Sequence, residues 1–428
     1  MRTAEIGRRI ALRPQDARYH THAVGPTGSG KSTLLENMAL ANILAGRAVV
    51  FLDIKGDSIY RLLRRIPREH WDQVVLLDPA LSERVVGLNV LELADASRRD
   101  LVADQVVAIF RRLFAQYWKD RSDDVMRSAV LTLLHHQGTT LVDVPGLLLD
   151  MRLQARWTRG LHDPVGLEPF WKEFRLLSET EQLNRVGPVL ARLRSILLRP
   201  AARNILGQSK STIDLEKILN TGGILLVNLA KGVLGEETAR LLGSLLVVQL
   251  WQASLRRARV PEEQRPDALV ILDEFPNYVH QAGLLAEGLV EARGYHIGWV
   301  MAHQYMAQLP HDLLTAVRAS AHTKIAFPAE DSDDAKATAP LFPGLTWENL
   351  MALDKHQVAV RLCVDGHTGP TFTGYTVDVP ESLGEEHAAG LITTSLTNFG
   401  RPRAEVEAEI LARLGLSSEG PLELEDLA

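Results

Sequence analysis

Gly25-Pro-Thr-Gly-Ser-Gly-Lys-Ser32 is the stretch of sequence that decides the fold. Residues 19–24, with apolar positions that lead into this glycine-rich turn, predict a strand. Apolar residues at helical spacing follow the turn and predict a helix over residues 31–45. The pattern GxxxxGK[ST] between a strand and a helix is a P-loop, whose glycines let backbone amides surround phosphate groups. The sequence therefore predicts a nucleoside-triphosphate site.

Each residue type in this loop suits triphosphate binding. The helix N-terminus adds a positive dipole, Lys31 is expected to reach the β- and γ-phosphates, and the Ser32 hydroxyl to bind Mg²⁺. A glycine-rich turn without a ligand is the alternative, and the flanking strand and helix disfavour it. We expect ATP and Mg²⁺ as cofactors, with the nucleotide bound by Gly25, Pro26, Thr27, Gly28, Ser29, Gly30, Lys31, Ser32 and Thr33.

A second motif completes the expected site. The apolar run 268–272 ends in Asp273-Glu274, the Walker B pattern. Asp273 is expected to hold Mg²⁺ or its water, and Glu274 to act as the general base toward the attacking water. Many strands end in acidic turns, so the pattern is weak alone, and the P-loop strengthens it. The second carboxylate is more typical of a hydrolase than of a static nucleotide binder.

Two more residues are candidates for the same reaction. Gln304 ends the strand expected at residues 298–303, where it can sense the γ-phosphate; a surface amide is the alternative. Arg293 precedes that strand and can serve as an arginine finger on a neighbour's ATP, unless it only forms a surface salt bridge. We predict that Lys31, Glu274, Gln304 and Arg293 are catalytic, and that Ser32 and Asp273 are the metal ligands.

The rest of the chain predicts an α/β protein with a mainly parallel central sheet. Unbroken apolar runs are typical of buried parallel strands, and hydrophobic periodicity predicts only helices between residues 97 and 220. The expected strands are residues 19–24, 48–53, 73–78, 223–228, 268–273, 298–303 and 323–327, and a hairpin is expected at 358–377. We expect a first core segment at 1–96, an inserted all-helical domain at 97–220, a second core segment at 221–380, and a C-terminal helix with an acidic tail at 381–428.

Composition narrows the setting of the protein. The net charge is −6, which argues against a surface that is basic all round but allows a basic channel. Cys363 is the single cysteine, so no intramolecular disulfide can form and a cytoplasmic setting fits. The N-terminus lacks the apolar region of a secretory signal. The apolar stretch 241–255 is too short to cross a bilayer and predicts a buried helix, so we expect no transmembrane segment.

Several motifs together resemble the HerA/FtsK superfamily of ring-forming DNA-translocating ATPases. Within it, the chain is similar to the soluble ATPase part of the coupling proteins of type IV secretion and conjugation. The motifs that carry this resemblance are GPTGSGKST (25–33), LDIKGD (52–57), VVLLDP (74–79), GLNVLE (87–92), NILGQSKSTIDL (204–215), ILLVNLAKG (224–232), ILDEFPNY (271–278) and ARGYHIGWVMAHQYMAQL (292–309).

The resemblance implies a RecA-like core with an inserted all-α domain, a hexamer with ATP sites between subunits, and single- or double-stranded DNA as the partner. It places the family's P-loop lysine on Lys31, its acidic pair on Asp273 and Glu274, its sensor glutamine on Gln304, and its trans-acting arginine on Arg293. Because the chain lacks the N-terminal transmembrane helices of membrane-bound coupling proteins, we expect a cytoplasmic protein that a membrane, secretion or nuclease partner can recruit to the inner membrane face.

Three functions are compatible with these residues. The first is a DNA translocase driven by Mg-ATP. The second is a related ring ATPase that acts on a protein partner or secretion substrate, and the third is an ATP-dependent assembly switch, which Glu274 disfavours. A basic cluster interleaved with aromatic residues is either a DNA contact or a solvated helix face; it comprises Arg111, Arg112, Phe114, Tyr117, Trp118, Lys119 and Arg121.

Overall fold

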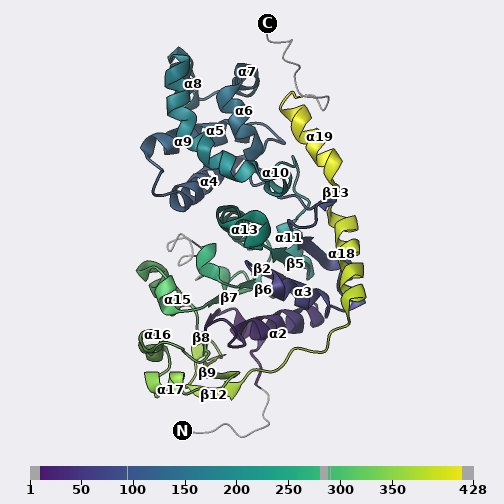
Figure 1. Ribbon diagram of the computed structural model, residues 1–428, viewed down its shortest axis with the longest axis vertical. Coiled ribbons are helices and arrows are strands. Elements are labelled where there is room, and N and C mark those ends of the chain that lie inside the picture. The colour runs from purple at the N-terminus through teal and green to yellow at the C-terminus, as the bar shows by residue number, and fades with distance from the viewer. Residues whose placement is uncertain (1–9, 94, 280–287, 290, 417–428) are drawn as a thin grey trace. The chain divides into compact units, whose positions relative to one another are not determined.

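The computed structural model describes residues 10–93, 95–279, 288–289 and 291–416, which divide between two compact units (Figure 1). The sheet unit takes the chain up to Asp78, then residues 214–232 and 242–398. The helical unit takes residues 79–213, 233–241 and the chain from Phe399 onward. Each unit is therefore assembled from segments that are far apart in the sequence.

A nine-stranded sheet is the centre of the first unit. Its strand order is β12-β9-β8-β1-β7-β6-β2-β5-β3. The strands are β1 (Thr21–Val24), β2 (Ala48–Asp53), β3 (Val74–Leu77), β5 (Ile224–Asn228), β6 (Ala268–Leu272), β7 (Ile297–His303), β8 (Thr323–Ala326), β9 (Gln357–Arg361) and β12 (Phe372–Tyr375). The seven strands from β8 to β3 run parallel, which confirms the predicted α/β class with a mainly parallel sheet.

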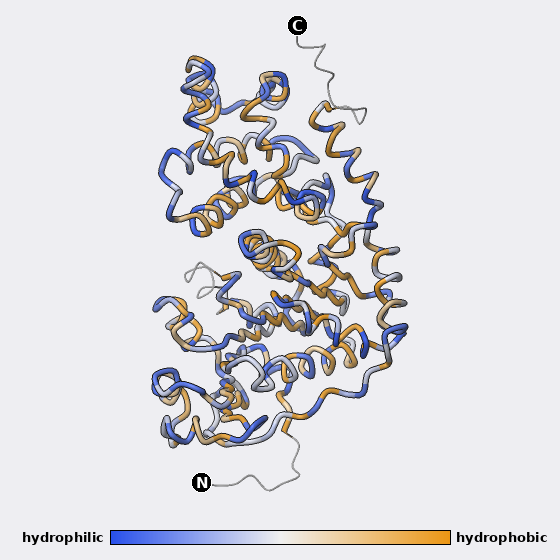
Figure 2. The backbone as a smooth tube through the Cα atoms, viewed as in Figure 1, coloured by the Kyte–Doolittle hydropathy of each residue, from blue (hydrophilic) through white to orange (hydrophobic). Residues whose placement is uncertain are grey.

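The seven parallel strands are buried along their whole length and mostly apolar, because helices cover both faces of the sheet. Figure 2 shows these strands among the hydrophobic stretches of the chain. In Figure 1, α2 and α3 lie on one face and α13 on the other. The helices and short strands of this unit include α1 (Pro14–Ala17), α2 (Lys31–Leu44), α3 (Asp57–Leu63), α11 (Leu215–Thr221), α13 (Glu236–Arg256, whose first residues belong to the helical unit), α15 (His311–Ser320), α16 (Ser332–Thr338), α17 (Trp347–Met351), α18 (Glu385–Phe399), β10 (Cys363–Val364) and β11 (His367–Thr368).

The predicted elements differ in detail from the observed ones. Strand β1 begins two residues later than predicted, because His20 has φ 60, a left-handed conformation that a strand cannot contain. The predicted hairpin is confirmed: β9 pairs antiparallel with β12. A second antiparallel pair, β10 with β11, lies in the segment between these two strands. The buried helix predicted from residue 241 is part of α13.

The second unit is helical. Its elements are β4 (Arg84–Val85), α4 (Arg99–Leu113), α5 (Asp120–Leu134), the 3-10 turn η3 (Leu141–Asp143), α6 (Val144–Leu149), α7 (Met151–Thr158), α8 (Leu167–Leu176), α9 (Glu179–Leu197), α10 (Pro200–Leu206), β13 (Arg401–Pro402) and α19 (Arg403–Arg413). Hydrophobic periodicity predicts one helix over residues 142–153, and this prediction is wrong. Asp150 adopts extended backbone and its carboxylate accepts from the amide of Arg152, so one helix ends there and another begins.

The helical unit begins and ends elsewhere than the expected boundaries at residues 97 and 220. The chain leaves the sheet at Asp78, and the segment after it bonds to the helical unit: Leu88 N donates to Ile205 O at 2.9 Å, and Gly87 N to Thr212 Oγ1 at 2.9 Å. The last described helix, α19, also belongs to this unit. Residues 417–428, the expected acidic tail, lie outside the described residues.

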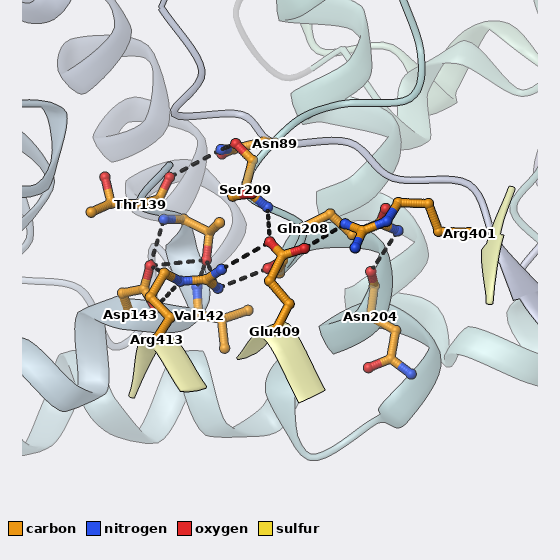
Figure 3. A network of polar contacts seen from close by, with 12 residues as sticks. Asn89, Thr139, Val142, Asp143, Asn204, Gln208, Ser209, Arg401, Glu409 and Arg413 are labelled. Carbon is orange, nitrogen blue, oxygen red and sulfur yellow. Dashed lines mark hydrogen bonds and ion pairs between the residues drawn. The ribbon is translucent and has the colours of Figure 1, made fainter. Parts of the chain in front are cut away.

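A buried ionic network joins α19 to the helices inserted between β3 and β5 (Figure 3). The guanidinium of Arg413, 10% exposed, donates to both carboxylate oxygens of Asp143 at 2.8 Å, and Asp143 is fully buried. Asp143 also accepts from the backbone amide of Thr140, as part of a capping box between the two residues. Glu409 accepts from the amide of Ser209 at 2.7 Å. Burial raises the pKa of Asp143, and Arg413 opposes that rise.

Arg413→Met is expected to destabilise the protein by about 3–5 kcal/mol, because it leaves a buried carboxylate without its cation. Urea unfolding measures the change. Arg403→Met is the matched control on the same helix: its half-exposed pair with Glu407 is worth about 0.3–0.5 kcal/mol. Equal losses for the two variants would contradict a structural role for the buried pair.

Candidate functional site

The P-loop lies at the carboxyl end of β1, in the middle of the sheet. Gly28 and Gly30 adopt φ of 82 and 103, a left-handed conformation that favours glycine. A Cβ atom on Gly25 would lie 2.5 Å from the Cβ of Phe327, so a side chain has no space at that position. Gly25 N donates to His303 O at 3.1 Å, and this bond ties the start of the loop to the end of β7.

Lys31, the first residue of α2, is buried between two carboxylates. Its Nζ donates to Asp273 Oδ1 at 2.9 Å and to Glu274 Oε1 at 3.0 Å, and all three side chains are at most 5% exposed. Burial, the largest single influence, lowers the pKa of Lys31. The charges and hydrogen bonds of both carboxylates outweigh it, and the pKa stands above its ordinary value. The structure thus joins the two motifs, 242 residues apart, in one ionic cluster.

Glu274 is held from two further sides. Gln304 Nε2 donates to Glu274 Oε1 at 2.9 Å, and Lys55 Nζ lies 3.8 Å from the same oxygen. Glu274 has φ 54, which is uncommon for a residue with a side chain and marks local strain. Gln304 is therefore placed at the carboxylate expected to activate water, as its prediction requires.

The residues expected to bind metal offer the right atoms. Ser32 is the second residue of α2, next to Lys31, and the carboxylate of Asp273 accepts from Lys31. A hydroxyl and a carboxylate are hard oxygen ligands, and Mg²⁺ is usually held by one or two such groups together with phosphate oxygens and water. The donor set therefore fits Mg²⁺ bound with a nucleotide.

Asp53 ends β2, next to the Walker B strand. Its carboxylate accepts from the amides of Lys55 at 2.8 Å and Ser58 at 2.9 Å, so it holds the turn that leads into α3. Burial first, and then the charge of Asp273, raise the pKa of Asp53. These bonds favour a structural role for Asp53, that of holding this turn, over a catalytic one, although Asp53 lies at the same edge of the sheet as the cluster.

Arg293 lies away from the cluster. It precedes β7, whose seven residues separate it from Gln304 by about 20 Å at the usual rise per residue. Its guanidinium stacks over the ring of Tyr19, 5.0 Å from the centroid. Arg293 therefore cannot reach the nucleotide of its own chain. The predicted role as an arginine finger applies only to the nucleotide of a neighbouring subunit.

Some residues of the basic cluster at 111–121 make contacts within the helical unit. Arg111 forms an ion pair with Asp123, and Trp118 Nε1 donates to Asp123 Oδ1 at 2.5 Å. Arg192 of α9 stacks on the ring of Tyr117, 4.2 Å from its centroid. These contacts favour the structural interpretation for Arg111 and Trp118.

Sequence reasoning missed a pair of buried histidines beside the cluster. His22 Nε2 and His303 Nε2 lie 2.7 Å apart, on the neighbouring strands β1 and β7. His303 Nδ1 lies 3.0 Å from Tyr305 O, and its ring meets the edge of Phe275, with centroids 5.5 Å apart. The signal available in the sequence was the position of each histidine near the end of its strand.

Comparison with solved structures confirms the fold that the motifs indicated. The conjugative coupling protein TrwB without its first 70 residues matches at TM-score 0.63 and 18% identity, over 89% of this chain and 92% of that chain. TrwB in complex with ADPNP matches at 0.64 and 16%, over 90% and 92%. VirB4 of Thermoanaerobacter pseudethanolicus matches at 0.56 and 14%, over 84% and 90%. The chain thus has the RecA-like P-loop NTPase fold of these proteins.

The other comparisons found no relatives: no protein-family model and no curated protein matches the sequence. In the part of the chain that the structure describes, no helix combines the length and the apolar character that crossing a membrane requires.

Glu274→Gln is expected to retain ATP binding, or to tighten it by up to about tenfold, because Lys31 then loses one of the two charges that compete with phosphate. Equilibrium titration with a fluorescent ATP analogue and Mg²⁺ measures this. Glu262→Gln, which alters an exposed carboxylate before β6, is the control and should bind as the wild type does. Tenfold weaker binding by Glu274→Gln would contradict the competition.

Buried histidines make stability depend on pH. Burial lowers the pKa of His20 to about 4 and of His303 to about 3, and that of His22 well below its ordinary value. Below about pH 6.5 the unfolded chain binds a proton at such a histidine, whereas the folded chain keeps it neutral. The free energy of unfolding is therefore highest above about pH 6.5 and decreases as the pH falls toward the pKa of the folded state.

When the pH is lowered from 7.5 to 5, each of these histidines is expected to lower the free energy of unfolding by about 2 kcal/mol. Urea unfolding at both pH values measures the loss. In His20→Gln the loss should shrink by about 2 kcal/mol, because one protonation site is gone. An unchanged pH dependence would show that His20 is not kept neutral by burial.

Proposed function

We propose that this protein is a Mg-ATP-hydrolysing motor that translocates DNA as a hexameric ring. The observation that carries the hydrolytic part is the joint placement of Lys31, Glu274 and Gln304 at the carboxyl edge of a parallel sheet. A P-loop, a buried acidic pair and a polar sensor meet there within hydrogen-bond distance. TrwB, which shares the fold, has been crystallised with ADP and Mg²⁺ and with ADPNP.

In the proposed reaction, the ionic cluster opens when the triphosphate enters. The phosphates take the place of Glu274 as partners of the Lys31 ammonium, since both are anions and the ammonium has three donors. Glu274 is then released to accept a proton from the attacking water, and Gln304 remains beside it to orient that water. The backbone N–H groups of the P-loop, residues 25–33 except Pro26, hold the β- and γ-phosphates in line for the displacement.

Ser32 and Asp273 would hold the Mg²⁺ that accompanies the nucleotide. When bound, the ion supplies positive charge that neutralises the phosphate oxygens. Asp273 donates no proton in this proposal; its carboxylate orients Lys31 before the nucleotide binds.

The proposed substrate is DNA, in agreement with the names of the proteins that share the fold. TrwB is a bacterial conjugative coupling protein, also called a plasmid coupling protein, and the resemblance in the motifs extends to DNA-translocating rings. A ring also explains Arg293: seated far from its own P-loop, it can act only on the nucleotide of an adjacent subunit. A related motor that acts on a secreted protein is the second candidate, and the experiment on DNA separates the two.

DNA should raise the steady-state rate of ATP hydrolysis at least several-fold, because a translocase couples turnover to its track. The measurement is phosphate release with single-stranded DNA, with double-stranded DNA and without DNA. Glu274→Gln should lower the rate by about 100-fold or more under all three conditions. Hydrolysis that depends on Glu274 and ignores both kinds of DNA would exclude DNA as the activating ligand and favour a protein substrate.

Mixing two inactive variants tests the role of Arg293 in trans. Lys31→Ala subunits lack the P-loop cation and Arg293→Ala subunits lack the finger, so each homogeneous ring should be inactive. In mixed rings, an Arg293→Ala subunit that is followed by a Lys31→Ala subunit regains a complete site, and activity should return to about a quarter of the wild-type rate at equal mixing. Mixtures that stay inactive while they co-assemble would remove Arg293 from the site.

A further inference from the structure

The hydrogen-bond pattern around His303 assigns the protons of the histidine pair. Tyr305 O is a carbonyl and can only accept, so His303 Nδ1 carries a hydrogen and donates to it at 3.0 Å. A neutral imidazole has one N–H, so His303 Nε2 must accept. His22 Nε2 is therefore the donor of the 2.7 Å bond, and His22 Nδ1 carries a lone pair.

Two further observations agree with this assignment. The planes of the two rings differ by 6° and their centroids are 5.0 Å apart, which is the geometry of an N–H···N bond in the plane of both rings. His22 Nδ1 is buried without a partner among the described residues, and an unpaired lone pair is more tolerable there than an unpaired N–H. Burial keeps both imidazoles neutral by lowering their pKa.

His303 contacts residues that adjoin each part of the hydrolysis site. Its backbone carbonyl accepts from Gly25, the first residue of the P-loop. Its ring packs against Phe275, which follows Glu274 directly. Its Nδ1–H donates to Tyr305 O, so the bond spans Gln304. The backbone N–H of Gln304 donates to Gln308 Oε1 at 2.8 Å.

We propose that the His22–His303 hydrogen bond is a positioning element for catalysis, which holds the end of β7 so that Gln304 stays bonded to Glu274. His22 and His303 are positioning residues, because neither touches the cluster of Lys31, Asp273 and Glu274. The bond joins the strand that leads into the P-loop to the strand that leads into Gln304. This inference rests on the proposed ATP hydrolysis, since its effect is on the rate of that reaction.

His20, the residue immediately before β1, shows what a buried histidine with a structural role looks like. It is equally buried, but its partners belong to the backbone: Nε2 lies 2.6 Å from Leu289 O, and Nδ1 accepts from Trp299 N at 3.1 Å. These contacts lie at the other end of β1 from the P-loop. His20 is therefore the matched control for a loss of stability that does not reach the site.

The test compares His22→Met, His22→Asn and His22→Gln with His20→Met. Methionine fills the space without a donor, and asparagine is too short to reach His303. Glutamine places an N–H near the position of Nε2 and should restore the bond. The readouts are kcat and KM for ATP hydrolysis, with the melting temperature as the measure of stability.

We expect His22→Met and His22→Asn to lower kcat by up to about tenfold, the effect of one lost hydrogen bond, while KM stays within about twofold. His22→Gln should recover most of kcat. His20→Met should lower the melting temperature and leave kcat within about twofold of the wild type.

Three results would overturn the inference: a wild-type kcat in His22→Asn, a kcat in His22→Gln as low as in His22→Asn, or a fall in kcat in His20→Met that matches its loss of stability. Failure of the proposed function is a separate result, because it would appear as absent hydrolysis in the wild-type chain itself.

Discussion

A lysine ammonium that is 5% exposed is the constraint on which the rest of the site depends. A buried charge requires opposite charge within a few ångströms, and Lys31 finds it in Asp273 and Glu274. The carboxylates can stand there only because the sheet places β1 and β6 on either side of β7, with all three strands pointing the same way. The order of the strands in the sheet is therefore what supplies the negative charge that the buried Lys31 requires.

The same arrangement explains why the intervening strand carries so many contacts. Strand β7 lies between the P-loop strand and the Walker B strand, so any shift of its end moves Gln304 relative to Glu274. Gly25 and His22 hold it on one side, and Phe275 meets it on the other. A strained backbone at Glu274 is tolerated in this setting because the surrounding contacts determine its position.

Much of this could be predicted from the sequence. The P-loop and the acidic pair have a recognisable spacing and a required context, so the sequence predicted that Lys31, Asp273, Glu274 and Gln304 lie at one edge of the sheet, and the structure brings them together. Their catalytic roles stay predictions. Apolar runs predicted most of the parallel strands. The His22–His303 bond could not be found, because it depends on the register between β1 and β7, which no local pattern encodes. The break at Asp150 was missed because hydrophobic periodicity continues across it, while the side chain caps the next helix.

The boundary of the helical unit also escaped prediction, for a physical reason. Residues 79–96 contain no long helix, so composition assigns them to the α/β core, yet their backbone groups bond to Ile205 and Thr212. The return of α19 to the same unit depends on the buried pair of Arg413 with Asp143, 270 residues earlier. Long-range polar contacts of this kind leave no periodic signal.

A structure of the protein with Mg²⁺ and a non-hydrolysable ATP analogue tests the central claim most directly. The account predicts that Lys31 Nζ leaves Glu274, now 3.0 Å away, and contacts a phosphate oxygen, while Ser32 and Asp273 face the ion. Glu274 should keep its bond to Gln304 and turn toward the γ-phosphate. A nucleotide bound with Lys31 still held between Asp273 and Glu274, or bound away from residues 25–33, would contradict it.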